Sequence, residues 1–180
     1  MRILKEKCSG LIIDIQEKLF PVMAEKELLI SNCLKLVEGL RILGVPTTYT
    51  QQYSKGLGET VDSIRELYLP FSFIEKNTFS CLDEPKYEAY LQKSAKNTIL
   101  IAGIESHVCV LQTAVDLQEK GYLPVIISDC ISSRNPADKI IALNRFMQEG
   151  IRISSVESIL FELTRASGTL EFKSISKIIK

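Results

Sequence analysis

The stretch TILIAGIESHVCVLQTAVDLQEKGYLPVIIS, residues 98–128, contains two apolar runs of strand length separated by a segment of helical spacing. The runs TILIAGI and PVIIS are almost continuously apolar and rich in β-branched residues, which is typical of strands covered on both faces of a sheet. Between them, Val110, Ala114 and Leu117 recur at steps of four and three, as on the buried face of a helix. Because a helix that joins neighbouring strands of one sheet makes them parallel, the stretch predicts a βαβ unit.

The same alternation continues on either side of this unit. Further runs of strand length bring the expected sheet to six strands, and they lie at 11–14, 46–50, 72–75 and 151–154. An apolar stripe from Leu29 to Leu43 predicts a helix after the first run. A second stripe, of Ile140, Leu143 and Met147, predicts a helix before the last run. Together they predict a three-layer, Rossmann-like α/β fold, with a six-stranded, mostly parallel sheet and helices on both faces.

Glycines mark the ends of three expected helices. Gly44, Gly121 and Gly150 each stand shortly before the next strand, and glycine readily adopts the left-handed conformation that ends a helix. The composition shows no break, so we expect a single domain over residues 1–180. Its tail, at about 168–180, has the apolar spacing of a short amphipathic segment that either docks on its own domain or contacts another subunit.

The composition narrows the classes of partner. The 22 basic and 22 acidic side chains cancel, whereas nucleic acids and anionic membranes usually select a basic face. No apolar run approaches the roughly 20 residues of a membrane span, and MRILKEKCSG is too polar for a signal peptide. We therefore expect a cytoplasmic protein that binds a small molecule and neither nucleic acid nor membrane.

The cysteine and histidine counts limit the chemistry. Five cysteines, an odd number without a C-x-x-C spacing, indicate free thiols in a reducing compartment. A single histidine, His107, excludes a site that needs several imidazoles. We expect no metal and no cofactor, so acid–base chemistry falls to Asp, Glu, Lys, Tyr or Cys.

Ionisable side chains follow three of the expected strands. Asp14, Lys76 and Cys109 lie close after apolar runs, and the carboxyl ends of parallel strands form the edge of a sheet where ligands bind. A thiol with a pKa of ~8.5 is a weak nucleophile at neutral pH until a neighbour takes its proton or stabilises its thiolate. Asp14 can accept that proton, and Lys76 can hold the resulting ion pair together.

Each of these residues also has a simpler interpretation. Asp14 could cap a helix, Lys76 could be a solvated lysine, and Cys109 could be a small buried apolar residue. His107 lies two residues before Cys109, a spacing that does not put both side chains on one helical face. We therefore interpret His107 as a rim or substrate-facing residue and not as the base of a Cys–His pair.

Four segments resemble the isochorismatase-like cysteine hydrolases. LIIDIQ (11–16), EKNTFS (75–80) and AGIESHVCVLQTA (102–114) occur in the order and at the spacing of that family. QQYSKGLGETV (51–61) is similar to its small isochorismatase-domain-containing subgroup. The resemblance extends from the first strand to about residue 165.

The resemblance implies a catalytic triad of Asp14, Lys76 and Cys109. Asp14 would deprotonate the thiol, Lys76 would orient both, and the thiolate would attack a carbonyl carbon to form an acyl-enzyme that water hydrolyses. It also implies a cis peptide bond between Ile104 and Glu105, which would aim the N–H groups of Glu105 and Cys109 at one oxyanion. The implied activity is metal-independent cleavage of a small amide or related C–N bond, with the substrate unidentified.

The resemblance extends to the surroundings of the triad. Gln16 is expected to border the substrate pocket and support it by hydrogen bonding. The other candidate pocket residues are Leu19, Phe20, Gln51, Tyr53 and His107, and for Leu19 and Phe20 packing in the core is the alternative. Metal-binding relatives carry an Asp and several His near the second strand, where this chain has TYTQQYSKG (48–56), so we expect no metal. Because relatives assemble as dimers or larger rings, the resemblance also implies a homo-oligomer.

Two other functions remain compatible with the sequence. The chain could be an oligomeric interaction module with a vestigial site, although a carboxylate, an ammonium and a thiol are all retained. It could also be a thiol-based redox protein in which Cys109 is oxidised and pairs with Cys81 or Cys130. No sequence feature places either of those cysteines close to Cys109.

Overall fold

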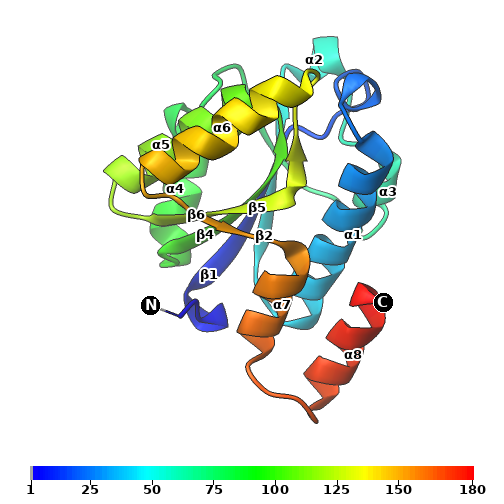
Figure 1. Ribbon diagram of the computed structural model, residues 1–180. Helices are drawn as coiled ribbons and strands as arrows, with labels where there is room; N and C mark the ends of the chain where they lie inside the picture. The colour runs from blue at the N-terminus through cyan, green and yellow to red at the C-terminus, as the bar shows by residue number, and fades with distance from the viewer. Residues whose placement is uncertain (1) are drawn as a thin grey trace.

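The computed structural model describes residues 2–180, whose strands form one six-stranded sheet between two layers of helices (Figure 1). The strand order is β3-β2-β1-β4-β5-β6, and every pair of neighbouring strands is parallel. This confirms the fold predicted from the sequence. The strands are β1 Cys8–Ile13, β2 Thr47–Gln52, β3 Ile74–Lys76, β4 Thr98–Ile104, β5 Leu123–Ser132 and β6 Arg152–Ser154.

Two apolar cores, one on each face, hold the helices against the sheet. One contains Leu100 of β4 and is covered by α1 Lys26–Ile42, α7 Val156–Thr164 and α8 Leu170–Ile179. The other contains Ile99 and Ile101 and is covered by α4 Pro85–Ser94, α5 Leu111–Glu119 and α6 Pro136–Gln148. Successive residues of β4 thus point to opposite faces, and both faces are buried, as the continuous apolar run predicts.

Shorter helical turns lie in the connections. They are η1 Lys5–Lys7, η2 Phe20–Val22, α2 Ser54–Leu57, α3 Asp62–Arg65, η3 Cys81–Asp83 and η4 Ser106–Val110, the last of which is a single turn of π-helix. Within residues 2–180, no helix combines the length and the apolar character needed to cross a membrane.

Helix α6 forms where expected, but its predicted buried stripe is wrong. Ile140 and Met147 are 59% and 60% exposed, whereas Ala142 and Phe146 are fully buried. Apolar residues occur around most of this helix, so their spacing alone does not select the face that contacts the sheet. The small Ala142 and the large Phe146 make that contact, and an apolar strip is left on the outside of α6.

The C-terminal tail docks on its own chain as α8. Ile175 is fully buried in the core beside α1 and α7. The Phe172 ring lies 6.0 Å from the ring of Phe161, and Lys5 Nζ binds the Glu171 carboxylate at 2.7 Å. Of the two roles that the sequence left open for this segment, the structure shows the docked helix.

The central strands β1 and β4 approach closely at their carboxyl ends. Gly103 pairs with Ile13 and has a φ of +131°, a conformation that side-chain-bearing residues rarely adopt. A Cβ at this position would lie 2.1 Å from the carbonyl oxygen of Ile13. The next peptide bond, Ile104–Glu105, is cis. Glycine at position 103 thus allows the segments that follow β1 and β4 to start close to each other.

Candidate active site

Asp14 lies in the first turn after β1 and is fully buried. Its φ of 52° is left-handed, a conformation that aspartate tolerates better than most residues. Its Oδ1 accepts a hydrogen bond of 2.8 Å from Thr50 Oγ1 on β2, and its Oδ2 lies 2.6 Å from Lys76 Nζ. Both carboxylate oxygens are therefore hydrogen-bonded, one to a residue of β2 and the other to a residue of β3.

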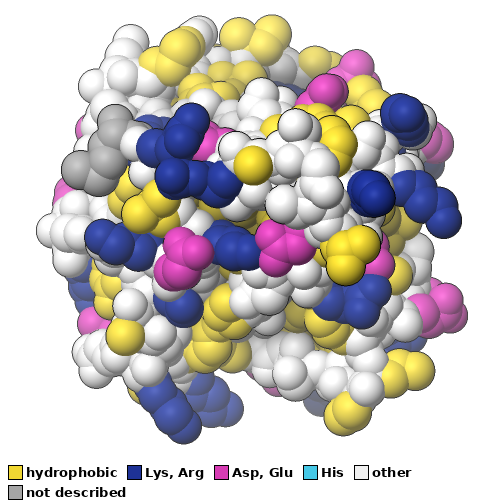
Figure 2. Space-filling view, turned by 90° about the horizontal axis from the view of Figure 1, so that it is seen from below, with side chains coloured by type: hydrophobic (Ala, Val, Ile, Leu, Met, Phe, Trp, Pro, Cys, Tyr) yellow, Lys and Arg dark blue, Asp and Glu magenta, His cyan; other side chains and the backbone are white. Residues whose placement is uncertain are grey.

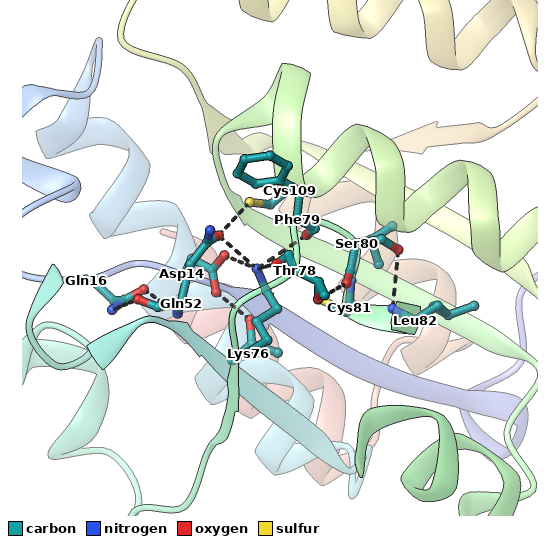
Figure 3. A network of polar contacts seen from close by, with 12 residues as sticks. Asp14, Gln16, Gln52, Lys76, Thr78, Phe79, Ser80, Cys81, Leu82 and Cys109 are labelled. Carbon is teal, nitrogen blue, oxygen red and sulfur yellow. Dashed lines mark hydrogen bonds and ion pairs between the residues drawn. The ribbon is translucent and has the colours of Figure 1, made fainter. Parts of the chain in front are cut away.

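Lys76 ends β3 and is almost completely buried, at 1% exposure. Besides Asp14, its ammonium contacts Gln52 Oε1 at 3.2 Å and the carbonyl oxygens of Thr78 at 3.0 Å and Phe79 at 3.3 Å (Figure 3). Burial acts to lower the pKa of Lys76, but the adjacent Asp14 charge opposes it and the net direction is upward. The lysine is therefore a buried, charged group that is fully hydrogen-bonded.

Cys109 lies in η4, next to this ion pair. Its Sγ donates to Gln52 Oε1 at 3.3 Å, and the residue is 6% exposed. Burial, the larger cause, and the negative charge of Asp14 together raise the pKa of the thiol to about 12, while the charge of Lys76 acts in the opposite direction. The resting thiol is therefore protonated. The structure brings the three residues singled out from the sequence together at the carboxyl ends of β1, β3 and β4.

The polar residue beside the thiol is Gln52, which the sequence analysis missed. It named Gln51, whose side chain instead bonds Thr60 at 3.0 Å and Ser54 at 2.8 Å. Successive residues of a strand point to opposite faces, so an error of one position reverses the direction of the side chain. The alternation of side chains along a strand identifies Gln52. It lies two residues after Thr50, the partner of Asp14, and therefore on the same face of the strand.

Gln16 supports the site from behind, as expected. Its Nε2 donates to the carbonyl oxygens of Gln52 at 3.0 Å and Gly58 at 2.7 Å, and its Oε1 accepts from the Gln52 N–H at 2.8 Å. The side chain of Gln16 therefore fixes the backbone of the residue that contacts both Lys76 and Cys109.

The turn that carries Cys109 is fastened to the segment after β5. The Glu105 carboxylate accepts from the Arg134 N–H at 3.0 Å and pairs with its guanidinium at 3.2 Å. His107 contacts Ser133 Oγ at 2.9 Å through Nδ1, and its Nε2 lies 3.8 Å from the Asp138 carboxylate. His107 thus points toward the start of α6 and not toward the thiol, which corrects its expected place in the pocket.

A cavity of about 120 Å³ opens at the thiol. Of the expected pocket residues only Leu19 lines this cavity, whereas Gln16, Phe20, Gln51, Tyr53 and His107 do not. The cavity walls are Leu19, Gln52, Leu57, Phe79, Ile104, Glu105, Val108 and Cys109. Figure 3 shows the Phe79 ring beside the thiol. A larger hollow of about 240 Å³ between α1 and α6 contains no thiol. We call the smaller space the thiol cavity.

Leu57, Phe79 and Val108 are wall residues that the sequence analysis missed. Phe79 follows Lys76 by three positions and Val108 precedes Cys109, so both adjoin residues already singled out. Tyr53, by contrast, is 52% exposed. Among residues 2–180, no group of three or more His, Cys, Asp or Glu side chains is placed to hold a metal ion.

The chain is thus an α/β protein with a doubly wound parallel sheet, and a carboxylate, an ammonium and a thiol lie at the carboxyl ends of its strands, where such sheets bind ligands. Within that class, the Isochorismatase domain model matches residues 10–158, and the chain belongs to this family. The family resemblance predicted from the sequence is thereby confirmed.

Individual relatives agree with this assignment. The secreted isochorismatase effector Isc1 of Phytophthora sojae (strain P6497) is 38% identical over 174 residues, which cover 94% of this chain and 82% of the relative. The MAR1 ribonuclease structure from Caenorhabditis elegans matches with a TM-score of 0.92 at 33% identity, over 99% of this chain and 92% of that one. The YcaC gene product of Escherichia coli, described as an octameric hydrolase of unknown specificity, shares the fold with a TM-score of 0.92 at 20% identity, over 99% and 90% of the two chains.

Proposed function

We propose that this protein is a metal-independent cysteine hydrolase that cleaves a small amide or related C–N bond through a thioester. The observation that supports it is the contact of Lys76 Nζ with Asp14 at 2.6 Å and of both Lys76 and Cys109 with Gln52 Oε1. A buried carboxylate, a charged lysine and a protonated thiol within one hydrogen-bonded group supply a base, its counter-ion and a nucleophile.

The reaction proceeds in two stages. As substrate binds, the thiol proton passes to Asp14 while Sγ attacks the carbonyl carbon and a C–S bond forms. The C–N bond then breaks, and the leaving nitrogen takes the proton from Asp14. Water adds to the thioester with Asp14 as base, which releases the acid and restores the thiol of Cys109.

The backbone after β4 supplies the oxyanion donors in this proposal. The N–H of Glu105 belongs to the cis peptide bond and has no backbone acceptor among the described residues. With the N–H of Cys109 it would stabilise the negative oxygen of the tetrahedral intermediate, and loss of one such donor typically costs ~10²–10³ in rate. The ion pair of Glu105 with Arg134 and the hydrogen bond between His107 and Ser133 hold this turn in place.

The test is the release of ammonia or amine from a panel of small amides. Cys109→Ala should reduce turnover by about 10³-fold or more, because no nucleophile remains. Cys8→Ala is the matched control, since Cys8 is also a buried free thiol but lies at the opposite end of β1. Turnover that survives Cys109→Ala and disappears with Cys8→Ala would contradict the proposal.

Assembly and location are part of the same proposal. The chain would form one domain that assembles with copies of itself in the cytoplasm. The exposed apolar strip of Ile140, Ile141 and Met147 on α6 and the five free thiols support this, and the YcaC gene product is octameric. Light scattering that gives only a 20.2 kDa monomer would contradict the assembly.

A further inference from the structure

We infer that the acyl group accepted by the thiol cavity is small, aliphatic and uncharged. This inference rests on the proposed function, because it takes Cys109 as the nucleophile. It specifies the substrate class that the hydrolysis alone leaves open. Three properties of the cavity carry it: its volume, the nature of its walls and the arrangement of charge around it.

The volume limits the size of the acyl group. The thiol cavity measures about 120 Å³, whereas an apolar cavity of about 150 Å³ is a known host for one benzene molecule. An aromatic ring that carries a carboxamide is larger than benzene. The volume of the thiol cavity therefore favours a short aliphatic acyl chain over an aromatic acid amide such as nicotinamide.

The walls favour an aliphatic group. Five of the eight residues that line the space are apolar: Leu19, Leu57, Phe79, Ile104 and Val108. Apolar walls gain free energy from contact with methyl and methylene groups, but they cannot replace the water that a hydroxyl or carboxylate loses on entering. A polar acyl chain would therefore find no hydrogen-bond partner among the side chains of these five apolar residues.

Charge excludes anionic acyl groups. The ammonium of Lys76 is buried and already faces four oxygen acceptors, so it does not line the cavity. The one ionisable carboxylate in the walls, Glu105, is paired with Arg134, which itself lies outside the walls. A substrate carboxylate would lose its hydration, meet no free cation and lie near Asp14.

Gln52 provides the polar contact that remains. Its carboxamide oxygen accepts from Lys76 and Cys109, and its amino group has no acceptor among the described residues. An amino group of this kind donates to a neutral carbonyl or hydroxyl oxygen without needing a charge. This matches an uncharged amide whose carbonyl lies against the thiol.

The test compares two alkylating agents of nearly equal size, iodoacetamide and iodoacetate, at pH 9. Each reagent forms an S–C bond at the thiolate and expels iodide. The two differ only in the group next to the reacting carbon, which is a neutral amide in iodoacetamide and a negative carboxylate in iodoacetate. The rate ratio at Cys109, divided by the ratio for glutathione, should favour iodoacetamide by roughly tenfold or more. A normalised ratio near one, or one that favours iodoacetate, would overturn the inference.

A variant tests the cause of the selectivity. Leu57→Lys should place a cation in the cavity wall and move the normalised ratio toward iodoacetate, while Leu57→Met, of similar length and no charge, should leave it unchanged. A ratio that shifts equally in both variants would show that size and not charge controls entry. That result would overturn the charge argument.

A substrate panel separates this inference from the proposed function. Hydrolysis of acetamide and propionamide, with little of succinamate or nicotinamide, supports both. Hydrolysis confined to succinamate or nicotinamide overturns the substrate class and leaves the hydrolase intact. Hydrolysis of no amide, together with selective alkylation by iodoacetamide, overturns the hydrolase but not the cavity's preference for small neutral groups.

Discussion

At the residue scale, the Asp14 carboxylate raises the pKa of both neighbouring groups. The same negative charge keeps Lys76 protonated and makes the Cys109 thiol harder to ionise. At neutral pH the amine of Lys76 is therefore charged, and the thiol of Cys109 is neutral. The thiol of Cys109 is therefore not held as a thiolate in the resting protein.

The charge of Asp14 can be tested by alkylation of Cys109. Asp14→Asn removes the negative charge that raises the thiol pKa, so the pKa should fall from about 12 and alkylation by iodoacetamide near pH 8 should accelerate, about tenfold per unit of pKa. Amide hydrolysis should nevertheless be lost, because the base is gone. Lys76→Met should act in the opposite direction on the pKa. Peptide mass spectrometry gives the rate for each cysteine, and slower alkylation in Asp14→Asn would contradict the prediction.

Thr50 should stabilise the fold through its bond to Asp14. Thr50→Val keeps the shape but removes the 2.8 Å bond to a buried carboxylate, which should lower the free energy of unfolding by about 2 kcal/mol. Thr48→Val is the matched control, since Thr48 lies on the same face of β2 and makes no side-chain hydrogen bond to a described residue. Urea titrations that give equal losses for both variants would contradict this assignment.

Sequence alone predicts part of this arrangement. Asp14, Lys76 and Cys109 could be placed at one edge because each lies close after an apolar run. To predict where a side chain points at the end of a strand, the strand must be located to the exact residue. An error of one position selects Gln51 instead of Gln52. The place of His107 could not be predicted because its partners, Ser133 after β5 and Asp138 in α6, lie far from it in the sequence.

At the scale of elements, the positions of the strands and helices were largely predictable. The helices α1, α5 and α6 end before Gly44, Gly121 and Gly150, whose φ angles of 68°, 83° and 73° confirm the predicted glycine ends. Apolar periodicity indicates whether a segment is buried, but it does not indicate which of two apolar faces contacts the sheet. The apolar spacing therefore predicts the position of α6 along the chain correctly, but it predicts the wrong face of α6 as buried.

Gly103 should be the glycine at which a side chain is least tolerated. Gly103→Ala places a Cβ 2.1 Å from the Ile13 carbonyl oxygen and should cost about 3 kcal/mol or more of unfolding free energy. Gly44→Ala, also at positive φ but with nothing within 4 Å, should cost about 1 kcal/mol. Thermal unfolding of the pair measures the difference, and similar losses would show that β1 and β4 can move apart.

Helix α8 should contribute to stability through one buried side chain. Ile175→Ala removes a fully buried side chain between α1 and α7, and we expect a loss of about 3 kcal/mol. Leu170→Ala in the same helix changes a residue that is 82% exposed and should alter stability by less than about 0.5 kcal/mol. Equal effects in urea unfolding would mean that α8 does not dock in solution.

At the scale of the whole molecule, several buried thiols should make the fold sensitive to alkali. Burial raises the pKa of Cys8, Cys81 and Cys109 from 9.0 to about 12. Above pH ~9 the unfolded chain therefore loses these protons first, binds fewer protons than the native state, and is stabilised relative to it. Each thiol should lower the free energy of unfolding by about 1 kcal/mol between pH 9 and 10, with no effect below pH ~8.

Urea titrations from pH 7 to 10 under reducing conditions measure this loss. Cys8→Ala removes one of the three thiols without touching the candidate active site, so its decline between pH 9 and 10 should be smaller by about 1 kcal/mol. A decline that is unchanged in Cys8→Ala would show that other groups, such as buried tyrosines, control the alkaline transition.

The separation in sequence of the site's contacts has a consequence for biosynthesis. The Lys76–Asp14 ion pair joins positions 62 residues apart, and the Cys109–Gln52 bond joins positions 57 apart. Contacts of such high order close large loops and form slowly, after the sheet has been ordered. A nascent chain on the ribosome therefore carries Cys109 as an ordinary exposed thiol, open to passing electrophiles. The mature fold buries that thiol and leaves Cys109 6% exposed, so the same electrophiles should react more slowly with the folded protein than with the nascent chain.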